Sequence, residues 1–147
     1  MNIMFVCTGN TCRSPMAAAI FNRRMQEIDR VDLHGESAGL GAMEGQPVSE
    51  NAVLACKEIG LDISGHTAHR LRGADITHCD LFVVMEDVHA KVLTGAGIPS
   101  KQVYVLDGGV EDPYGKDLDT FRACRDEITE KLKGFEQYLL QEALLQA

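Results

Sequence analysis

The sequence predicts an α/β fold, a single domain whose four-stranded parallel sheet carries helices on both faces. Short apolar runs typical of buried strands alternate with longer segments whose apolar residues recur at helical spacing. The 147 residues (1–147) suit one domain, and no linker, internal repeat or low-complexity stretch divides them. With 45% hydrophobic and 24% charged residues, the composition is that of a globular protein with an ordinary core.

The first half of the chain begins with an apolar strand over 2–6, followed by a polar loop. Pro15 then suits the first turn of a helix that runs to about Ile28. A weak strand is predicted over 31–34 and a glycine-rich loop over 37–47. Ser49 is suited to cap the next helix, which breaks near Gly60. The segment 65–71 is harder to place, and a short helix is one interpretation.

In the second half, the continuous apolar run over 80–85 predicts a strand buried on both faces. A helix over 86–94 follows, and the last strand is predicted over 102–106. A glycine-rich loop over 107–115 then leads to a long terminal helix, whose apolar positions recur from Phe121 to Leu139. Because ligands of such sheets bind outside the carboxyl ends of the strands, the loops after the first and last strands should share one cleft.

The loop after the first strand has the composition of an anion site. It reads Cys7-Thr8-Gly9-Asn10-Thr11-Cys12-Arg13-Ser14-Pro15. Its backbone N–H groups and the helix N-terminus favour a bound anion, and Arg13 can hold two oxygens of a tetrahedral one. We therefore predict that the residues from Thr8 to Ser14 bind phosphate. The same positive environment favours the thiolate form of Cys7.

Together the two loops predict phosphoryl transfer through a cysteine. Cys7 would attack phosphorus and form a phosphocysteine, while Arg13 and the loop N–H groups stabilise the developing charge. Ser14 would offer its hydroxyl to the sulfur, both as thiolate and as leaving group. Asp112, held by Pro113 in the loop after the last strand, is the candidate general acid, and its carboxylate would later activate water.

Charge and cysteine content narrow the partners and the compartment. The formal charge of −8 argues against a nucleic-acid partner, although a local basic site can still take an anionic substrate. Because no apolar run reaches the length of a membrane span and no leader is visible, we expect a cytoplasmic protein without a membrane partner. Five scattered cysteines fit reduced thiols. His66 and His69 lack the neighbours of a metal site, so neither a metal nor another cofactor is expected.

The motifs together resemble the low-molecular-weight protein tyrosine phosphatase family. The resemblance covers nearly the whole chain and rests on three stretches: 7–15, Ser37-Ala38-Gly39 and Asp112-Pro113-Tyr114. It implies a flavodoxin-like sheet and a phosphorylated protein as substrate, with phosphate or another oxyanion bound in the loop. The catalytic roles of the family fall on Cys7, Arg13 and Asp112. The family positions that shape and brace the phosphate loop are matched by Asn10, Ser14 and His66.

Within this resemblance, four residues bear on the choice of substrate: Thr11, Met43, Tyr114 and Gly115. The tyrosine-specific members usually carry isoleucine at the Thr11 position, an aromatic near Met43 and often a bulky residue where Gly115 follows Tyr114. This chain has none of the three, and its loop reads like that of the family's protein arginine phosphatases. A threonine hydroxyl can face a guanidinium, whereas isoleucine favours a phenyl ring. Phosphoarginine on proteins is therefore the favoured substrate, and phosphotyrosine the alternative.

Two other classes of function compete with a phosphatase. Thiol-dependent arsenate reduction uses the same fold and loop, but it relays oxidation through two further cysteines near the third strand, where this chain offers only Cys79. A noncatalytic anion-binding or redox module would use Cys7 and Cys12 without Asp112. Cys12 itself is either a packing residue or the partner of Cys7 in a reversible disulfide, and the sequence supports both equally.

Overall fold

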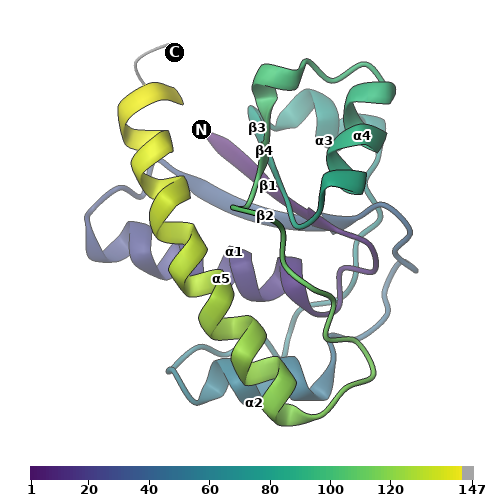
Figure 1. The fold of residues 1–147 in the computed structure, drawn as a ribbon, viewed down its shortest axis with the longest axis vertical. Helices are drawn as coiled ribbons and strands as arrows, with labels where there is room; N and C mark the ends of the chain where they lie inside the picture. The colour runs from purple at the N-terminus through teal and green to yellow at the C-terminus, as the bar shows by residue number, and fades with distance from the viewer. Residues whose placement is uncertain (144–147) are drawn as a thin grey trace.

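A four-stranded parallel sheet forms the centre of the molecule, with strand order β2-β1-β3-β4 (Figure 1). The computed structural model describes residues 1–143, so positions 144–147 of the predicted domain lie outside the described residues. The strands are β1 (Asn2–Cys7), β2 (His34–Gly39), β3 (Leu81–Val84) and β4 (Val103–Val105). All three neighbouring pairs run parallel, which confirms the predicted fold class.

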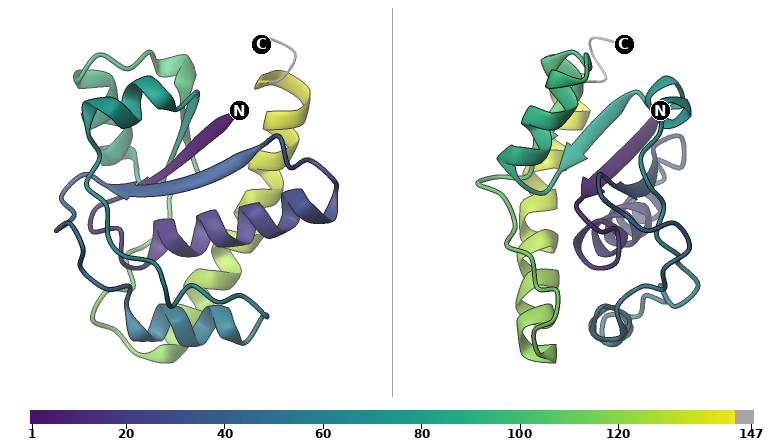
Figure 2. Two further views of the ribbon diagram at one scale, coloured as in Figure 1. Left: turned by 180° about the vertical axis from the view of Figure 1, so that it is seen from behind. Right: turned by 90° about the vertical axis from the view of Figure 1, so that its right-hand side faces the viewer.

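Helices lie on both sides of this sheet (Figures 1 and 2). One side carries α1 (Arg13–Glu27), α2 (Glu50–Lys57) and α5 (Leu118–Tyr138). The other side carries α3 (Gly73–His78) and α4 (Asp87–Gly95). A 3-10 turn, η1 (Ser100–Gln102), precedes β4, and a π-helical turn, η2 (Leu139–Ala143), follows α5. Among the described residues, no helix combines the length and the apolarity needed to cross a membrane.

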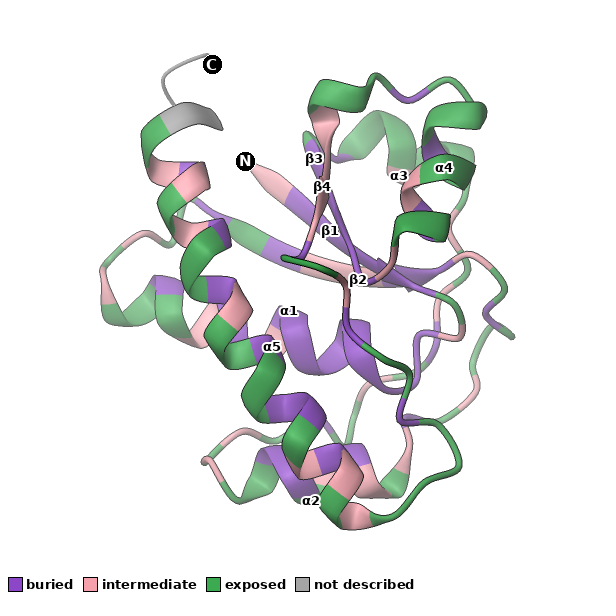
Figure 3. Cartoon of the chain, viewed as in Figure 1, coloured by how far each residue is buried: buried purple, intermediate pink, exposed green. Residues whose placement is uncertain are grey.

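Side chains that alternate along the strands build two apolar layers. β1 and β3 are buried along most of their length, whereas β4 is half-buried throughout (Figure 3). Phe5 of β1 faces the layer shared with α1, α2 and α5, whereas Val6 faces the layer under α4. Phe135 of α5 is fully buried, and its ring centroid lies 6.1 Å from that of Phe5 and 5.8 Å from that of Phe21 in α1. This aromatic contact fixes α5 against both α1 and the sheet.

The second strand occupies a later stretch than the predicted one, so the prediction over 31–34 was wrong. Residues 31–32 form a turn, and Val31 is 72% exposed. β2 begins at His34 and takes in 37–39, which were predicted as loop. These weak strand formers adopt the β conformation because β1 pairs with them along its whole length, so tertiary pairing overrides local propensity.

The segment 65–71 is not helical, and the short helix of this region, α3, begins only at Gly73. Instead the segment runs along the open edge of β2. The Gly39 N–H donates to the His69 carbonyl at 2.9 Å, and the Leu71 N–H donates to the Gly39 carbonyl at 3.0 Å. The segment thereby covers the carboxyl end of β2, where Gly39 pairs with Cys7.

The remaining helices and strands lie within a few residues of their predicted positions. One difference concerns α2, which ends at Lys57, while the chain turns back at Gly60 with a φ of 80° that suits glycine. Ser49 precedes α2, but its side chain makes no capping hydrogen bond. Its hydroxyl instead contacts Cys12.

Candidate active site

The residues predicted to carry the chemistry meet at the carboxyl edge of the sheet. Cys7 is the last residue of β1, Arg13 is the first of α1, and the loop between them lies at this edge. Asp112 reaches the same place from the segment after β4, and its Oδ2 lies 3.6 Å from Arg13 Nη2. Because parallel strands share one carboxyl edge, residues far apart in the sequence become neighbours here.

A cavity of about 180 Å³ opens at this loop. Its walls come from the loop, from the Asp112 segment and from one residue after β2: Cys7, Thr8, Gly9, Asn10, Thr11, Cys12, Arg13, Gln46, Asp112 and Tyr114. Of the four predicted selectivity residues, Thr11 and Tyr114 line the cavity. Met43 is 72% exposed and lies outside the lining, as does Gly115. Gln46, which was not among the predicted site residues, does line the cavity.

Two hydrogen-bond donors are directed at the Cys7 sulfur. The Asn10 backbone N–H donates to Sγ at 3.3 Å, and Ser14 Oγ lies 2.9 Å from Sγ. Asn10 Nδ2 donates to Ser14 Oγ at 2.8 Å, so the hydroxyl hydrogen of Ser14 is free to be donated to the sulfur. This arrangement stabilises negative charge on Cys7.

Asn10 is the residue that fixes the shape of the loop. It is fully buried and adopts a left-handed conformation with a φ of 57°, which asparagine tolerates better than most residues. Its Oδ1 accepts hydrogen bonds from the His69 N–H at 2.8 Å and from His66 Nε2 at 3.2 Å, and its carbonyl accepts from His66 Nε2 at 3.1 Å. Burial lowers the pKa of His66, so the neutral imidazole supplies this donor at neutral pH.

The Arg13 guanidinium is 1% exposed and is held by acceptors from two other segments. Its Nη1 donates to the Val110 carbonyl at 2.8 Å and lies 3.1 Å from Glu86 Oε2. Its Nε is also buried but has no hydrogen-bond partner among the described residues. Because buried donors are almost always paired in native proteins, this N–H is available to an acceptor from outside the chain.

Glu86 and His89 belong to the site although the sequence analysis missed them. His89 is buried at the start of α4, and its Nε2 lies 3.0 Å from Thr8 Oγ1 and 3.5 Å from Glu86 Oε2. Burial and the nearby Arg13 charge lower the pKa of His89. The position of Glu86 in the sequence could have indicated its place in the site. It follows almost directly after β3, at the carboxyl edge where ligands of parallel sheets bind.

The Cys12 thiol contacts a residue outside the loop. Its Sγ lies 3.0 Å from Ser49 Oγ, which ties the phosphate loop to the start of α2. Burial raises the pKa of the Cys12 thiol, although the hydrogen bond from Ser49 opposes that shift. Both Cys7 and Cys12 carry free thiols. This contact fits the packing interpretation of Cys12, while a reversible disulfide stays a prediction.

Comparisons with known proteins agree with this geometry. Residues 2–145 match the family described as low molecular weight phosphotyrosine protein phosphatase. A protein-arginine-phosphatase of Geobacillus stearothermophilus is 34% identical over 134 residues, which cover 86% of this chain and 87% of the relative. Other relatives are named probable low molecular weight protein-tyrosine-phosphatase, from Ralstonia nicotianae, and arsenate reductase, from Bacillus cereus.

Solved structures show the same fold. The low molecular weight protein tyrosine phosphatase of T. tengcongensis has a TM-score of 0.89 and 37% identity, covering 95% of this chain and 99% of the other. The YwlE arginine phosphatase, in a variant with a phosphorylated active-site serine in place of a cysteine, has a TM-score of 0.87 and 31% identity, with 97% of each chain covered.

Proposed function

Because this chain belongs to the low molecular weight phosphotyrosine protein phosphatase family, we propose that it hydrolyses phosphoarginine on proteins through a phosphocysteine intermediate. The observation that carries the arginine preference is Thr11, which is 5% exposed and lines the cavity beside Cys7. Its backbone carbonyl accepts a hydrogen bond from the Ser49 N–H at 2.9 Å, so its position is fixed. Its hydroxyl offers a guanidinium an acceptor that an isoleucine would lack.

In the first step, the Cys7 thiolate attacks phosphorus and the phosphorus–nitrogen bond to the guanidinium breaks. Arg13 and the loop N–H groups stabilise the charge on the transferred oxygens. Asp112 gives its proton to the departing nitrogen. Two features support that role: its carboxylate lies 3.6 Å from Arg13, and the Tyr114 N–H donates to its Oδ1 at 3.1 Å, which orients the side chain.

In the second step, water attacks the phosphorus of the phosphocysteine, and the phosphorus–sulfur bond breaks. Asp112, now ionised, takes a proton from the water. Cys7 leaves as a thiolate, and the hydrogen bond from Ser14 Oγ stabilises it, as it does before the first step. Free phosphate then leaves the loop, and it should inhibit the enzyme by binding the same N–H groups.

The test of substrate class compares kcat/KM on phosphoarginine protein with kcat/KM on a phosphotyrosine peptide. We expect a ratio well above one that falls by about tenfold or more in Thr11→Ile, since one pocket substitution shifts selectivity by about 1–3 kcal/mol. Thr8→Val is the matched control, because Thr8 lies in the same loop but its hydroxyl faces His89. A ratio below one in the parent would make the protein a tyrosine phosphatase and reject the role of Thr11.

The test of mechanism uses Cys7→Ser and Asp112→Ala. Cys7→Ser should abolish turnover, and Asp112→Ala should slow substrates with poor leaving groups most, because these depend on the general acid. Full activity of Asp112→Ala on such substrates would reject the acid assignment. Full activity of Cys7→Ser would reject the phosphocysteine, an intermediate for which the phosphorylated active-site serine of a relative supplies a precedent.

Arsenate reduction is the weaker candidate despite the relatives that bear that name. Cys79 lies just before β3, at the amino end of the strand, whereas Cys7 ends the neighbouring parallel strand β1. The two thiols therefore lie toward opposite edges of the sheet. A relay that needs direct attack of one sulfur on another has no short path between them.

A further inference from the structure

Three side chains of different metal-ligating classes meet away from Cys7, on the face of the sheet that carries α3. Glu36 lies in β2, His78 ends α3 and Cys79 follows it. His78 Nε2 lies 3.0 Å from Glu36 Oε2, and Cys79 Sγ lies 3.8 Å from the same oxygen. One ligand atom from each of the three residues lies within 4.8 Å of the other two.

We propose that Glu36, His78 and Cys79 form a binding site for a divalent transition-metal ion of the zinc class. Thiolate sulfur, imidazole nitrogen and carboxylate oxygen are the ligands zinc takes in proteins. Tetrahedral bonds of about 2.0–2.3 Å place such ligand atoms roughly 3.3–3.6 Å apart. The separations of 3.0 and 3.8 Å bracket that range, so small side-chain rotations would complete the site. Water fills the fourth position.

The surroundings attract a cation. Asp75 and Asp80 add their negative charges to that of Glu36 around the sulfur of Cys79, a residue that is 5% exposed. When the metal binds, the S–H bond of Cys79 breaks, the proton passes to solvent and a metal–sulfur bond replaces a metal–water bond. The ion needs no oxidant or other co-reactant, because no ligand changes its oxidation state.

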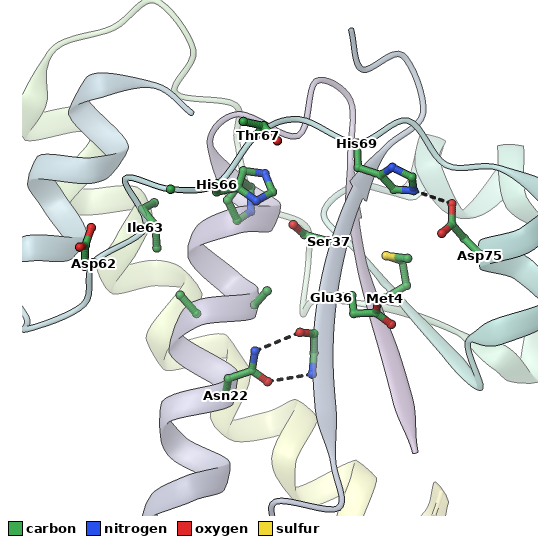
Figure 4. A pocket seen from close by; sticks show the side chains of 15 residues that line it. Met4, Asn22, Glu36, Ser37, Asp62, Ile63, His66, Thr67, His69 and Asp75 are labelled. Atoms are coloured by element: carbon green, nitrogen blue, oxygen red, sulfur yellow. Dashed lines mark hydrogen bonds and ion pairs between the residues drawn. The ribbon is translucent and has the colours of Figure 1, made fainter. Parts of the chain in front are cut away.

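The site is open to solvent. Glu36 and Asp75 line a groove of about 670 Å³, where Figure 4 shows them on the same side of β2 as Met4. The His78 side chain is exposed. Asp75 is itself held by a hydrogen bond between its Oδ2 and His69 Nε2 at 2.8 Å, so it supports the site without serving as a ligand.

Metal binding would fasten α3 to the sheet. None of the six residues of α3 is buried, and its Asp75 contacts His69 of the preceding segment. An ion bound by Glu36, His78 and Cys79 would tie the C-terminal end of the helix to the edge strand β2. Binding to the folded chain alone raises the temperature of unfolding. This inference does not depend on the proposed phosphatase reaction, because the site shares no residue with it.

The experiment titrates the reduced, metal-free full chain with Co²⁺ and, separately, with Zn²⁺. We expect one ion per chain, a thiolate-to-cobalt charge-transfer band in the near ultraviolet and a higher Tm with either ion. Cys79→Ser should remove the band, and His78→Ala and Glu36→Gln should each weaken binding by about tenfold or more. Cys124→Ser is the matched control for a buried thiol, and Cys7→Ser tests binding at the catalytic loop.

Two outcomes would overturn the proposal. One is a charge-transfer band that survives Cys79→Ser or disappears in Cys7→Ser. The other is equal affinity in the parent and in His78→Ala. His78→Ala tests the proposed metal site even if Cys79→Ser fails to fold. The His78 side chain is exposed, so its loss leaves the core unchanged.

Discussion

Asn10→Asp should redirect the hydrogen bond that stabilises the Cys7 thiolate. Asn10 Nδ2 donates to Ser14 Oγ at 2.8 Å, which frees the hydroxyl hydrogen for the sulfur 2.9 Å away. A carboxylate accepts instead of donating, so Ser14 would donate to residue 10, and the sulfur would lose the hydroxyl donor while keeping the backbone N–H of residue 10. Aspartate has nearly the same shape, tolerates the φ of 57° and keeps an acceptor for His66 and His69.

The size of the effect follows from the contact that is lost. A hydrogen bond to a charged group contributes about 1.5–3 kcal/mol. Its loss from the transition state corresponds to about a 10- to 150-fold fall in kcat/KM. The added carboxylate of Asn10→Asp would also repel the phosphate proposed to bind this loop, and this repulsion acts in the same direction. We therefore expect kcat/KM to fall by at least about tenfold.

The assay is a double-mutant cycle of Asn10→Asp and Ser14→Ala on one phosphorylated substrate. Because both changes remove the same hydrogen bond to Cys7, their effects should be less than additive by at least about 0.5 kcal/mol. Asn22→Asp is the matched control, since the Asn22 amide holds Gly35 outside the site. Additive effects in the cycle, or an Asn10→Asp enzyme within twofold of the parent, would refute the reasoning.

Three further predictions concern stability. Gly39→Ala should lower both Tm and phosphate affinity, measured by thermal unfolding with and without phosphate, because its Cβ would lie 2.5 Å from the Thr8 carbonyl of the loop. Phe135→Ala should cost about 3–5 kcal/mol in urea unfolding, since the ring is fully buried among four other aromatic rings. Two arginines of α5 lower the pKa of Glu58 to about 2, so the carboxylate stabilises the fold above its usual pKa, and this stabilisation is lost as the pH falls toward 2. Glu58→Gln should flatten that pH dependence in urea unfolding between about pH 4.5 and 2.

The sheet was predictable where strands carry an apolar run, and β2 shows where that signal ends. β3 is buried on both faces and reads as a continuous apolar segment, so its position followed from composition. β2 reads His-Gly-Glu-Ser-Ala-Gly, which contains no such run. It becomes a strand because β1 offers it a full ladder of hydrogen bonds. A partner that lies elsewhere in the chain leaves no local mark in the sequence.

The residues of the candidate site were likewise predictable only in part. The cysteine-to-arginine loop is contiguous, so its residues were named from spacing, and Asp112 followed from the rule that carboxyl ends of parallel strands share one edge. Glu86 and His89 escaped notice because their roles arise from contacts with Arg13 and Thr8 that only the fold creates. The expectation of no metal stays a prediction, and the metal site proposed above stands against it.

That expectation was argued from the neighbours of two other histidines, whereas the proposed metal site joins adjacent residues of one segment to a glutamate on another strand. His78 and Cys79 follow each other directly, which is not a familiar metal-binding spacing. Glu36 joins them only because β2 lies along the edge of the sheet, with α3 above it. Since the strand itself was misplaced in the prediction, the sequence could not place Glu36, the proposed ligand, beside His78 and Cys79.

Burial disfavours the thiolate form of three of the cysteines. It raises the pKa of Cys56 to about 11 and those of Cys79 and Cys124 to about 12, so all three stay protonated thiols at neutral pH. Cys7 is as buried as they are, but the Asn10 N–H is directed at its sulfur, as is the neighbouring hydroxyl. Because the thiolate is the nucleophile, these two contacts support the proposal that Cys7 carries the nucleophilic chemistry. A metal ion brings the positive charge that the surroundings of Cys79 lack, so the burial that makes this thiol a poor nucleophile still leaves it available as a ligand.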